Sequence, residues 1–190
     1  MMVKELFYTL QGEGANVGRP AVFCRFAGCN LACEWCDTDF VGGTPFDAEQ
    51  LAAAAARLWP IGVRHHFVVL TGGEPALQVT PKLIEELHRR RFVVAIETNG
   101  TKPLPQSIDW VTFSPKAGAP HVLTRAHEVK IVWPQALDLA AFEGPQWGEH
   151  FLQPMDGPRL REHTTQAIDV CLRWPLWRLS IQQHKVLGLP

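Results

Sequence analysis

Short apolar runs separated by amphipathic stretches dominate the 190-residue chain. The runs rich in valine, isoleucine and aromatic residues predict seven strands, at 21–26, 67–70, 92–96, 110–113, 129–132, 150–152 and 177–181. Helical patterns fall between them, at 47–58, 80–91, 138–142 and 161–172. Asp47 and Thr80 are typical N-caps, and Pro81 suits the first helical position. Because buried strands alternate with helices and no linker or repeat interrupts them, we expect one α/β domain over 1–190 with a mostly parallel sheet.

Polar and chemically reactive residues follow most of these apolar runs. The short segments are Cys29-Asn30, Thr71 to Pro75, Glu97 to Gly100, Ser114 to Lys116 and Gln153 to Asp156. In parallel α/β sheets and barrels, ligands bind at the carboxyl ends of the strands. We therefore expect these segments to converge on one site.

The charge balance argues for a small-molecule substrate. The 18 basic and 19 acidic residues give a net charge of −1, and no basic run supplies a nucleic-acid footprint. Residues 1–10 include Lys4 and Glu5, so they lack the continuous apolar core of a signal peptide or a membrane span. We expect a cytoplasmic protein that contacts neither nucleic acid nor membrane.

Five cysteines form an odd set, and four of them lie within residues 24–36. Such crowding is typical of metal or cluster ligands in a reducing compartment rather than of disulfides. Cys29, Cys33 and Cys36, spaced C-x3-C-x2-C, can hold three irons of a [4Fe-4S] cluster and leave the fourth iron open. A structural zinc site in an interaction module is the alternative, but zinc needs a fourth ligand. Cys24, in a strand, and Cys171, in a helix, are expected in the core.

Two motifs resemble the radical S-adenosylmethionine (SAM) superfamily. They are the C-x3-C-x2-C loop, with Trp35 before its last cysteine, and Gly72-Gly73-Glu74-Pro75. More narrowly, residues 8–14, 18–25, 36–40, 114–116 and 153–158 resemble the 7-carboxy-7-deazaguanine synthases, so the resemblance covers nearly the whole chain. It implies a Mg2+-dependent lyase that uses SAM to contract 6-carboxy-5,6,7,8-tetrahydropterin to 7-carboxy-7-deazaguanine, with loss of ammonia, in queuosine and deazapurine biosynthesis.

The resemblance also assigns roles to individual residues. Cys29, Cys33 and Cys36 would bind the cluster, and Thr38 would offer one oxygen to Mg2+, with water and substrate completing the shell. The residues expected to bind the pterin are Leu10, Gln11, Gly12, Glu13, Arg25, Thr71, His184 and Pro190. Those expected to bind SAM are Glu34, Trp35, Asp37, Gly73, Glu97, Asn99, Ser114, Pro115, Lys116, Gln153, Pro154, Met155 and Asp156.

Some of these roles compete with ordinary structural ones. Arg25 offers a charged fork for a carboxylate, yet an isolated arginine usually forms a surface ion pair. Glu97 and Asn99 suit SAM, but Glu-Thr-Asn-Gly is equally typical of a strand that enters a turn. A terminal tail such as the one that ends at Pro190 usually frays.

The implied chemistry needs no side chain as nucleophile or base. A SAM-derived radical takes hydrogen from the pterin, and the protein contributes positioning and exclusion of water. The electron would come from a flavodoxin or ferredoxin. Because a full eight-unit barrel takes about 250 residues, we expect a partial, open (β/α) barrel of radical SAM type, whose edge is covered by a homodimer partner or the terminal segments. A glycyl-radical activase of the same superfamily remains the alternative.

Overall fold

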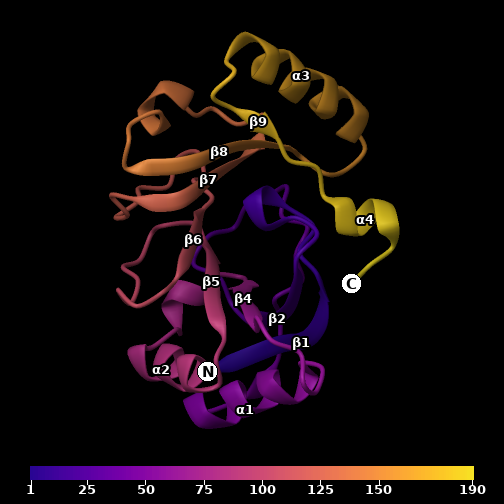
Figure 1. Ribbon diagram of the computed structural model, residues 1–190. Coiled ribbons are helices and arrows are strands. Elements are labelled where there is room, and N and C mark those ends of the chain that lie inside the picture. Colours follow the sequence, from indigo (N-terminus) through magenta and orange to yellow (C-terminus); the bar gives the residue numbers. More distant parts are fainter.

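A single nine-stranded sheet organises the computed structural model, which describes residues 1–190 (Figure 1). The strands are β1 Met2–Leu10, β2 Pro20–Phe26, β3 Thr44–Pro45, β4 Phe67–Gly72, β5 Val93–Thr98, β6 Trp110–Phe113, β7 Ala126–Trp133, β8 Trp147–Pro154 and β9 Arg178–Leu179. Their order is β3-β1-β2-β4-β5-β6-β7-β8-β9. Neighbours from β2 to β9 are parallel, whereas β1 pairs antiparallel with β2 and β3. The expected open, mostly parallel sheet is confirmed.

Four α-helices accompany the sheet, and their starting points follow the sequence. They are α1 Ala48–Leu58, α2 Pro81–Arg89, α3 Leu160–Arg173 and α4 Gln183–Leu187. Asp47 caps α1 by accepting a bond from the Gln50 N–H at 2.8 Å, while the Gln50 side chain accepts from the Asp47 N–H at 3.0 Å. Thr80 accepts from the Leu83 N–H at the start of α2. Three 3-10 helices, Gly14–Asn16, Pro75–Leu77 and Leu139–Phe142, complete the secondary structure.

The hydrophobic core is divided into two clusters. One contains 23 buried residues, among them Phe67 and Leu83, where α1 packs on β1 and β2 and α2 packs on β5. The other contains 10 buried residues, including Phe113 and Trp177, where α3 packs on β7, β8 and β9. Figure 1 shows α1 and α2 at one end of the molecule and α3 at the other, with the sheet running between them. The two apolar clusters therefore lie toward opposite ends of the sheet.

The structure adds elements that the sequence pattern did not predict. Residues 2–10 form β1, and residues 183–187 form α4, which has no buried side chain. The helix expected at 138–142 is a 3-10 helix, Leu139–Phe142, and the last strand is limited to Arg178–Leu179. None of the helices has both the length and the apolar run required to span a bilayer.

Both cysteines assigned to the core lie where they were expected. Cys24 is 1% exposed on β2. Cys171, on α3, is partly buried against the second hydrophobic cluster.

Candidate active site

A cavity of about 340 Å3 lies at the carboxyl ends of the parallel strands. The predicted site residues that line it are Leu10, Gln11, Gly12, Glu13, Arg25, Cys29, Cys33, Trp35, Cys36, Asp37, Thr38, Thr71, Gly73, Glu97, Asn99, Ser114, Lys116, Gln153, His184 and Pro190. They come from segments more than 170 residues apart in the chain. The expectation that the polar segments after the strands converge is therefore confirmed.

Five predicted SAM contacts, Glu34, Pro115, Pro154, Met155 and Asp156, do not line this cavity. Glu34 is exposed, and the two prolines are buried. Met155 is anchored through its backbone: its N–H donates to the Trp133 carbonyl, and its carbonyl bonds to His163. Asp156 forms an ion pair with Lys185. Their roles toward SAM stay predictions.

The three clustered cysteines lie on the loop that follows β2. All three are free thiols; Cys29 and Cys33 are partly buried and Cys36 is exposed. The Leu31 N–H points at the Cys29 sulfur, at 3.4 Å, and so favours its thiolate. Burial raises the pKa of Cys33, but the nearby ammonium of Lys116 opposes this increase. A positive group such as Lys116 beside the loop stabilises the thiolate form in which cysteines bind a cluster.

The Gly-Gly-Glu-Pro segment packs directly against the cysteine loop. The Gly73 N–H donates to the Phe26 carbonyl at 3.0 Å, and the Glu74 N–H donates to the Gly28 carbonyl at 2.9 Å. A Cβ atom on Gly73 would lie 1.9 Å from the Gly28 carbonyl oxygen. Only glycine allows the two loops to approach this closely.

Glu74 fixes this segment to the end of the next strand. Its fully buried carboxylate accepts hydrogen bonds from the Thr98 hydroxyl, the Asn99 N–H and the Ala76 N–H, at 2.7 to 2.9 Å. Burial raises the pKa of Glu74, and these three donors oppose the increase. Glu74 therefore holds the ends of β4 and β5 in one arrangement.

The segment at the end of β5 forms a turn and also lines the cavity. Gly100 has a φ of +75°, as a turn residue does, and Asn99 bonds to Asn30 and Thr101. Asn99 nevertheless lines the cavity, and the Glu97 carboxylate accepts from Thr71 at 2.9 Å and from Gln11 at 3.1 Å. The turn interpretation is confirmed for Asn99-Gly100, while contact with SAM stays a prediction.

The donor set fits a cluster better than a single metal ion. No three His, Cys, Asp or Glu side chains come together in a geometry suited to one ion. A cubane is much larger, and three separated thiols on one loop beside a cavity suit it. Lys116 lies beside this loop, 5.4 Å from the centre of the Trp35 ring and bonded to both oxygens of Ser114. Thr38 lines the cavity as well, but it offers one hydroxyl only.

A buried charged group forms the inner wall of the cavity. Lys130, on β7, forms ion pairs with Glu13 and Glu97, and its neighbour Glu128 is 2% exposed. We did not single out Lys130 or Glu128 from the sequence. The signal was present, because residues two apart on a strand share a face, and these two charges alternate with the buried Val129 and Ile131.

The C-terminal segment closes one side of the cavity. The Gln183 N–H donates to the Gly12 carbonyl at 3.0 Å, and His184 packs so closely that a Cβ on Gly12 would lie 2.3 Å from its Nδ1. Lys185 bonds to Asp37 and to Asp156, each at 2.5 Å. The tail is thus packed against the site rather than frayed. Lys185 and Gln182, which bonds to Glu13 and Asp37, were not singled out from the sequence.

Comparison with known proteins agrees with this geometry. The model of the radical SAM superfamily matches residues 24–141. The chain is 54% identical to a 7-carboxy-7-deazaguanine synthase of Burkholderia multivorans, over 99% of this chain and 98% of the relative. It is 51% identical to that of Bradyrhizobium diazoefficiens, over 98% of each chain. The crystal structure of QueE from Escherichia coli matches with a TM-score of 0.76 and 31% identity, over 95% of this chain and 93% of that one.

These relatives match the chain along its full length, and the superfamily model spans both the cysteine loop and the Gly-Gly-Glu-Pro segment. Superfamily membership implies a [4Fe-4S] cluster and SAM, for which the three thiols and the adjoining cavity are suited. The chain belongs to the 7-carboxy-7-deazaguanine synthase family of radical SAM enzymes, and it is a lyase.

Proposed function

We propose that this lyase contracts the ring of 6-carboxy-5,6,7,8-tetrahydropterin to give 7-carboxy-7-deazaguanine and ammonia, with Mg2+ assisting. The observation that carries the proposal is one cavity that joins a loop of three free thiols to a wall of fixed hydrogen-bonding groups. Such a wall suits a flat heterocycle with a donor and acceptor edge. The relatives carry the name of this synthase, which supports the same substrate.

The chain's own residues bind and orient the reactants. When bound, the cluster and SAM supply the one-electron chemistry that starts the reaction. Gln11, Glu13 and Glu97 present amide and carboxylate groups to the cavity, which suits them to the ring edge. Arg25 faces the same space and also pairs with Glu5 at 3.1 Å, so its guanidinium is held where a substrate carboxylate can bind.

Magnesium is proposed to bind between Thr38 and the substrate. Thr38 lies on the cavity wall, close to Asp37, whose carboxylate accepts from its hydroxyl at 3.3 Å. Magnesium favours six oxygens and keeps water or substrate oxygens where the protein supplies few. Its proposed role is to orient the substrate carboxylate and offset developing negative charge.

Two partners are also proposed. An electron-donating flavodoxin or ferredoxin would approach near Cys36, the most exposed of the three thiols. A second copy of the chain would cover the apolar surface at the end of α3, where Leu172 is 76% and Trp174 is 51% exposed. Size-exclusion chromatography with light scattering of wild type and Leu172→Glu tests the homodimer.

Anaerobic reconstitution followed by product analysis tests the reaction. Purified chain is loaded with iron and sulfide, and SAM cleavage and pterin turnover are followed by mass spectrometry with and without Mg2+. We expect conversion of the pterin, loss of both activities in Cys33→Ala, and retention of both in Cys24→Ala, which is buried away from the cavity. SAM cleavage without any pterin conversion would refute the proposal and favour an activase that acts on a protein.

A further inference from the structure

Lys130 is the only cationic side chain that forms ion pairs with the carboxylates of the inner cavity wall. Its side chain is 6% exposed, and it contacts Glu13, from the loop after β1, and Glu97, at the end of β5. Glu128 lies two residues before it on the same face of β7. Two carboxylates from two segments therefore share one ammonium group, and the buried Glu128, which accepts from the Ala15 N–H at 2.9 Å, lies within reach of its charge.

Glu13 and Glu97 are held in fixed orientations. Glu13 accepts from Lys130 through one oxygen and from Gln182, at 2.9 Å, through the other. Glu97 accepts from Gln11 and Thr71 and lies 3.5 Å from the Lys130 ammonium. Both glutamates line the cavity, and a carboxylate can accept about four hydrogen bonds. Each therefore keeps free acceptor positions toward a bound ligand.

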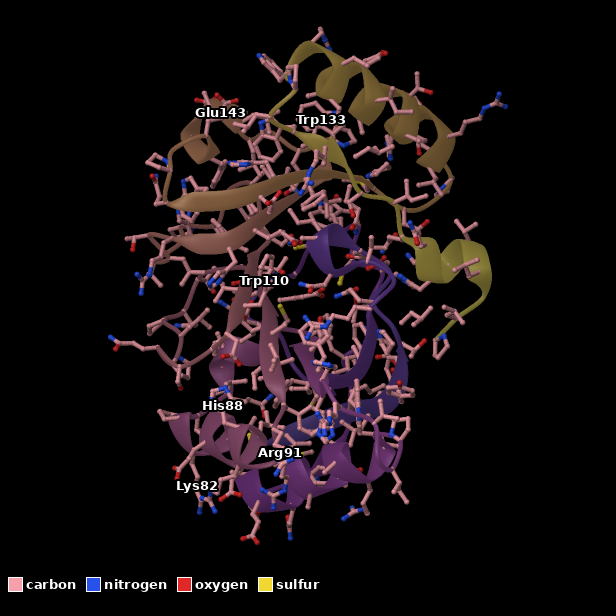
Figure 2. The ribbon with its side chains drawn as sticks, viewed as in Figure 1. Lys82, His88, Arg91, Trp110, Trp133 and Glu143 are labelled. Atoms are coloured by element: carbon pink, nitrogen blue, oxygen red, sulfur yellow. The ribbon has the colours of Figure 1, made fainter.

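A second and much smaller space adjoins these carboxylates. A space of about 10 Å3, enough for roughly one water molecule, lies under them between Glu13, Glu97, Glu128 and Trp110. Figure 2 shows Trp110 between the half of the molecule with α1 and α2 and the half with α3. Lys130 is the cation that pairs with Glu13 and Glu97 beside this space.

We propose that Lys130 is a positioning residue that pairs with Glu13 and Glu97 and keeps both carboxylates directed into the cavity, so that both accept hydrogen bonds from the N–H edge of the pterin. The inference rests on the proposed function. It adds that the Lys130 ammonium allows the Glu13 and Glu97 carboxylates to act as two adjacent hydrogen-bond acceptors. Two carboxylates without a shared cation would repel each other, and one would take up a proton. A protonated carboxyl group presents an O–H donor to the N–H donors of the pterin edge. Two donors cannot form a hydrogen bond with each other, so the pterin would not be recognised.

The electrostatics of the network support this role. Burial raises the pKa of Glu13, but the charge and hydrogen bond of Lys130 outweigh it and hold that pKa below its ordinary value. Burial raises the pKa of Glu128, and Lys130 is the largest opposing influence. The other charged groups that act on the network are Lys116, which follows β6, and His184, on α4.

Replacing Lys130 by methionine removes the charge and keeps the length of the side chain. Glu13 then loses its contacting cation, so its pKa increases and it takes up a proton at a higher pH than in the wild type. Ligand affinity must decrease most at low pH and recover as the pH increases. If one proton is coupled to binding, the ratio of the variant to the wild-type Kd changes by about tenfold per pH unit below the new pKa.

The test measures binding of 6-carboxypterin, a fluorescent and unreactive probe, to anaerobically reconstituted enzyme at several pH values. Dividing the Kd of Lys130→Met by that of wild type at each pH cancels titration of the probe itself. We expect this ratio to decrease toward one as the pH increases, and Lys130→Arg to restore pH-independent binding. Glu13→Gln in the Lys130→Met background should reduce the pH dependence, since it removes one titrating group.

Two outcomes separate this inference from the proposed function. If wild type binds no pterin, the proposed function fails. If wild type binds but the Kd ratio of Lys130→Met stays constant with pH, Lys130 serves packing alone and this inference is overturned. Iron content and circular dichroism establish whether Lys130→Met is folded. If it is not, the single variant Lys130→Gln and the double variant Glu128→Gln/Lys130→Met allow the same measurement of the Kd ratio against pH.

Discussion

The contact between Gly73 and the Gly28 carbonyl leads to a sharp prediction for Gly73→Ala. The new Cβ would lie 1.9 Å from the Gly28 oxygen, 2.5 Å from its carbon and 3.1 Å from the Cys29 nitrogen. Because carbon and oxygen atoms in contact are at least about 3.3 Å apart, one loop must move by about 1.4 Å. All three neighbours are backbone atoms, so no side chain can rotate away to relieve the clash.

That displacement separates the segment predicted to hold SAM from the loop predicted to hold the cluster. A misplacement of about 1 Å costs on the order of a hundredfold in rate, whereas overpacking costs about 1–3 kcal/mol of stability. We therefore expect Gly73→Ala to fold and to retain iron, but to cleave SAM about a hundredfold more slowly.

Chromatographic measurement of 5'-deoxyadenosine, with iron content and Tm measured in parallel, tests this prediction. Gly144→Ala is the matched control, because its Cβ meets only the end of the flexible Gln146 side chain, at 2.4 Å. A Gly73→Ala enzyme that cleaves SAM at the wild-type rate would show that the two loops do not need their close contact.

Three further predictions concern the charged and sulfur-containing residues. Lys185→Met should change stability by no more than about 1 kcal/mol, since its ion pairs are partly exposed, but hydrogen exchange across 182–190 should accelerate. Unchanged exchange would mean that the hydrogen bonds of Gln182 and Gln183 hold the tail without Lys185. Burial lowers the pKa of Lys116 to about 8, so between about pH 8 and 10.5 the unfolded chain binds more protons at this residue than the folded one. The stability of the apo-protein relative to Lys116→Met should therefore increase with pH across that window by about 1–3 kcal/mol, and a flat difference in urea titrations would contradict it. Cys24→Ala should bind as much iron as wild type and Cys29→Ala much less, because only Cys29 reaches the cavity; equal loss in both would reassign the ligands.

The sequence predicted the centre of the fold well because its strands are buried on both faces. Strands such as Phe67–Gly72 form nearly continuous apolar runs, and the polar segments that follow them meet because parallel strands end at one edge. The same regularity predicted the cavity, because the cysteine loop and Glu97 both lie at the carboxyl ends of parallel strands.

The edges and the terminal segments lacked such a signal. Strand β1 alternates between exposed and half-buried positions around Lys4 and Glu5, so no apolar run marks it. Helix α4 has five residues and none is buried, so no helical periodicity could be detected. Its position comes from contacts with Gly12 and Asp37, which lie nearly the whole chain away.

Lys130 and Glu128 illustrate a different limit. They lie within an apolar run that is typical of an ordinary buried strand. The charge of Lys130 is tolerated because Glu13 and Glu97 approach from other elements, and Glu128 accepts from the Ala15 N–H near Lys130. Local composition cannot show whether a buried charge has a partner, because the partner is supplied by tertiary structure.

The packing of residues 10–13 against α4 has a consequence for the order in which the parts of the chain fold. Residues 10–13 receive their last neighbours only after residues 183–190 have been synthesised, because Gln183 and His184 pack on Gly12 and Pro190 reaches the cavity wall. A nascent chain can thus form both hydrophobic clusters while the cavity is still exposed to solvent on the side that α4 later covers. For the same reason, an affinity tag joined after Pro190 would lie beside the cavity wall, and recombinant protein should carry its tag at the other end.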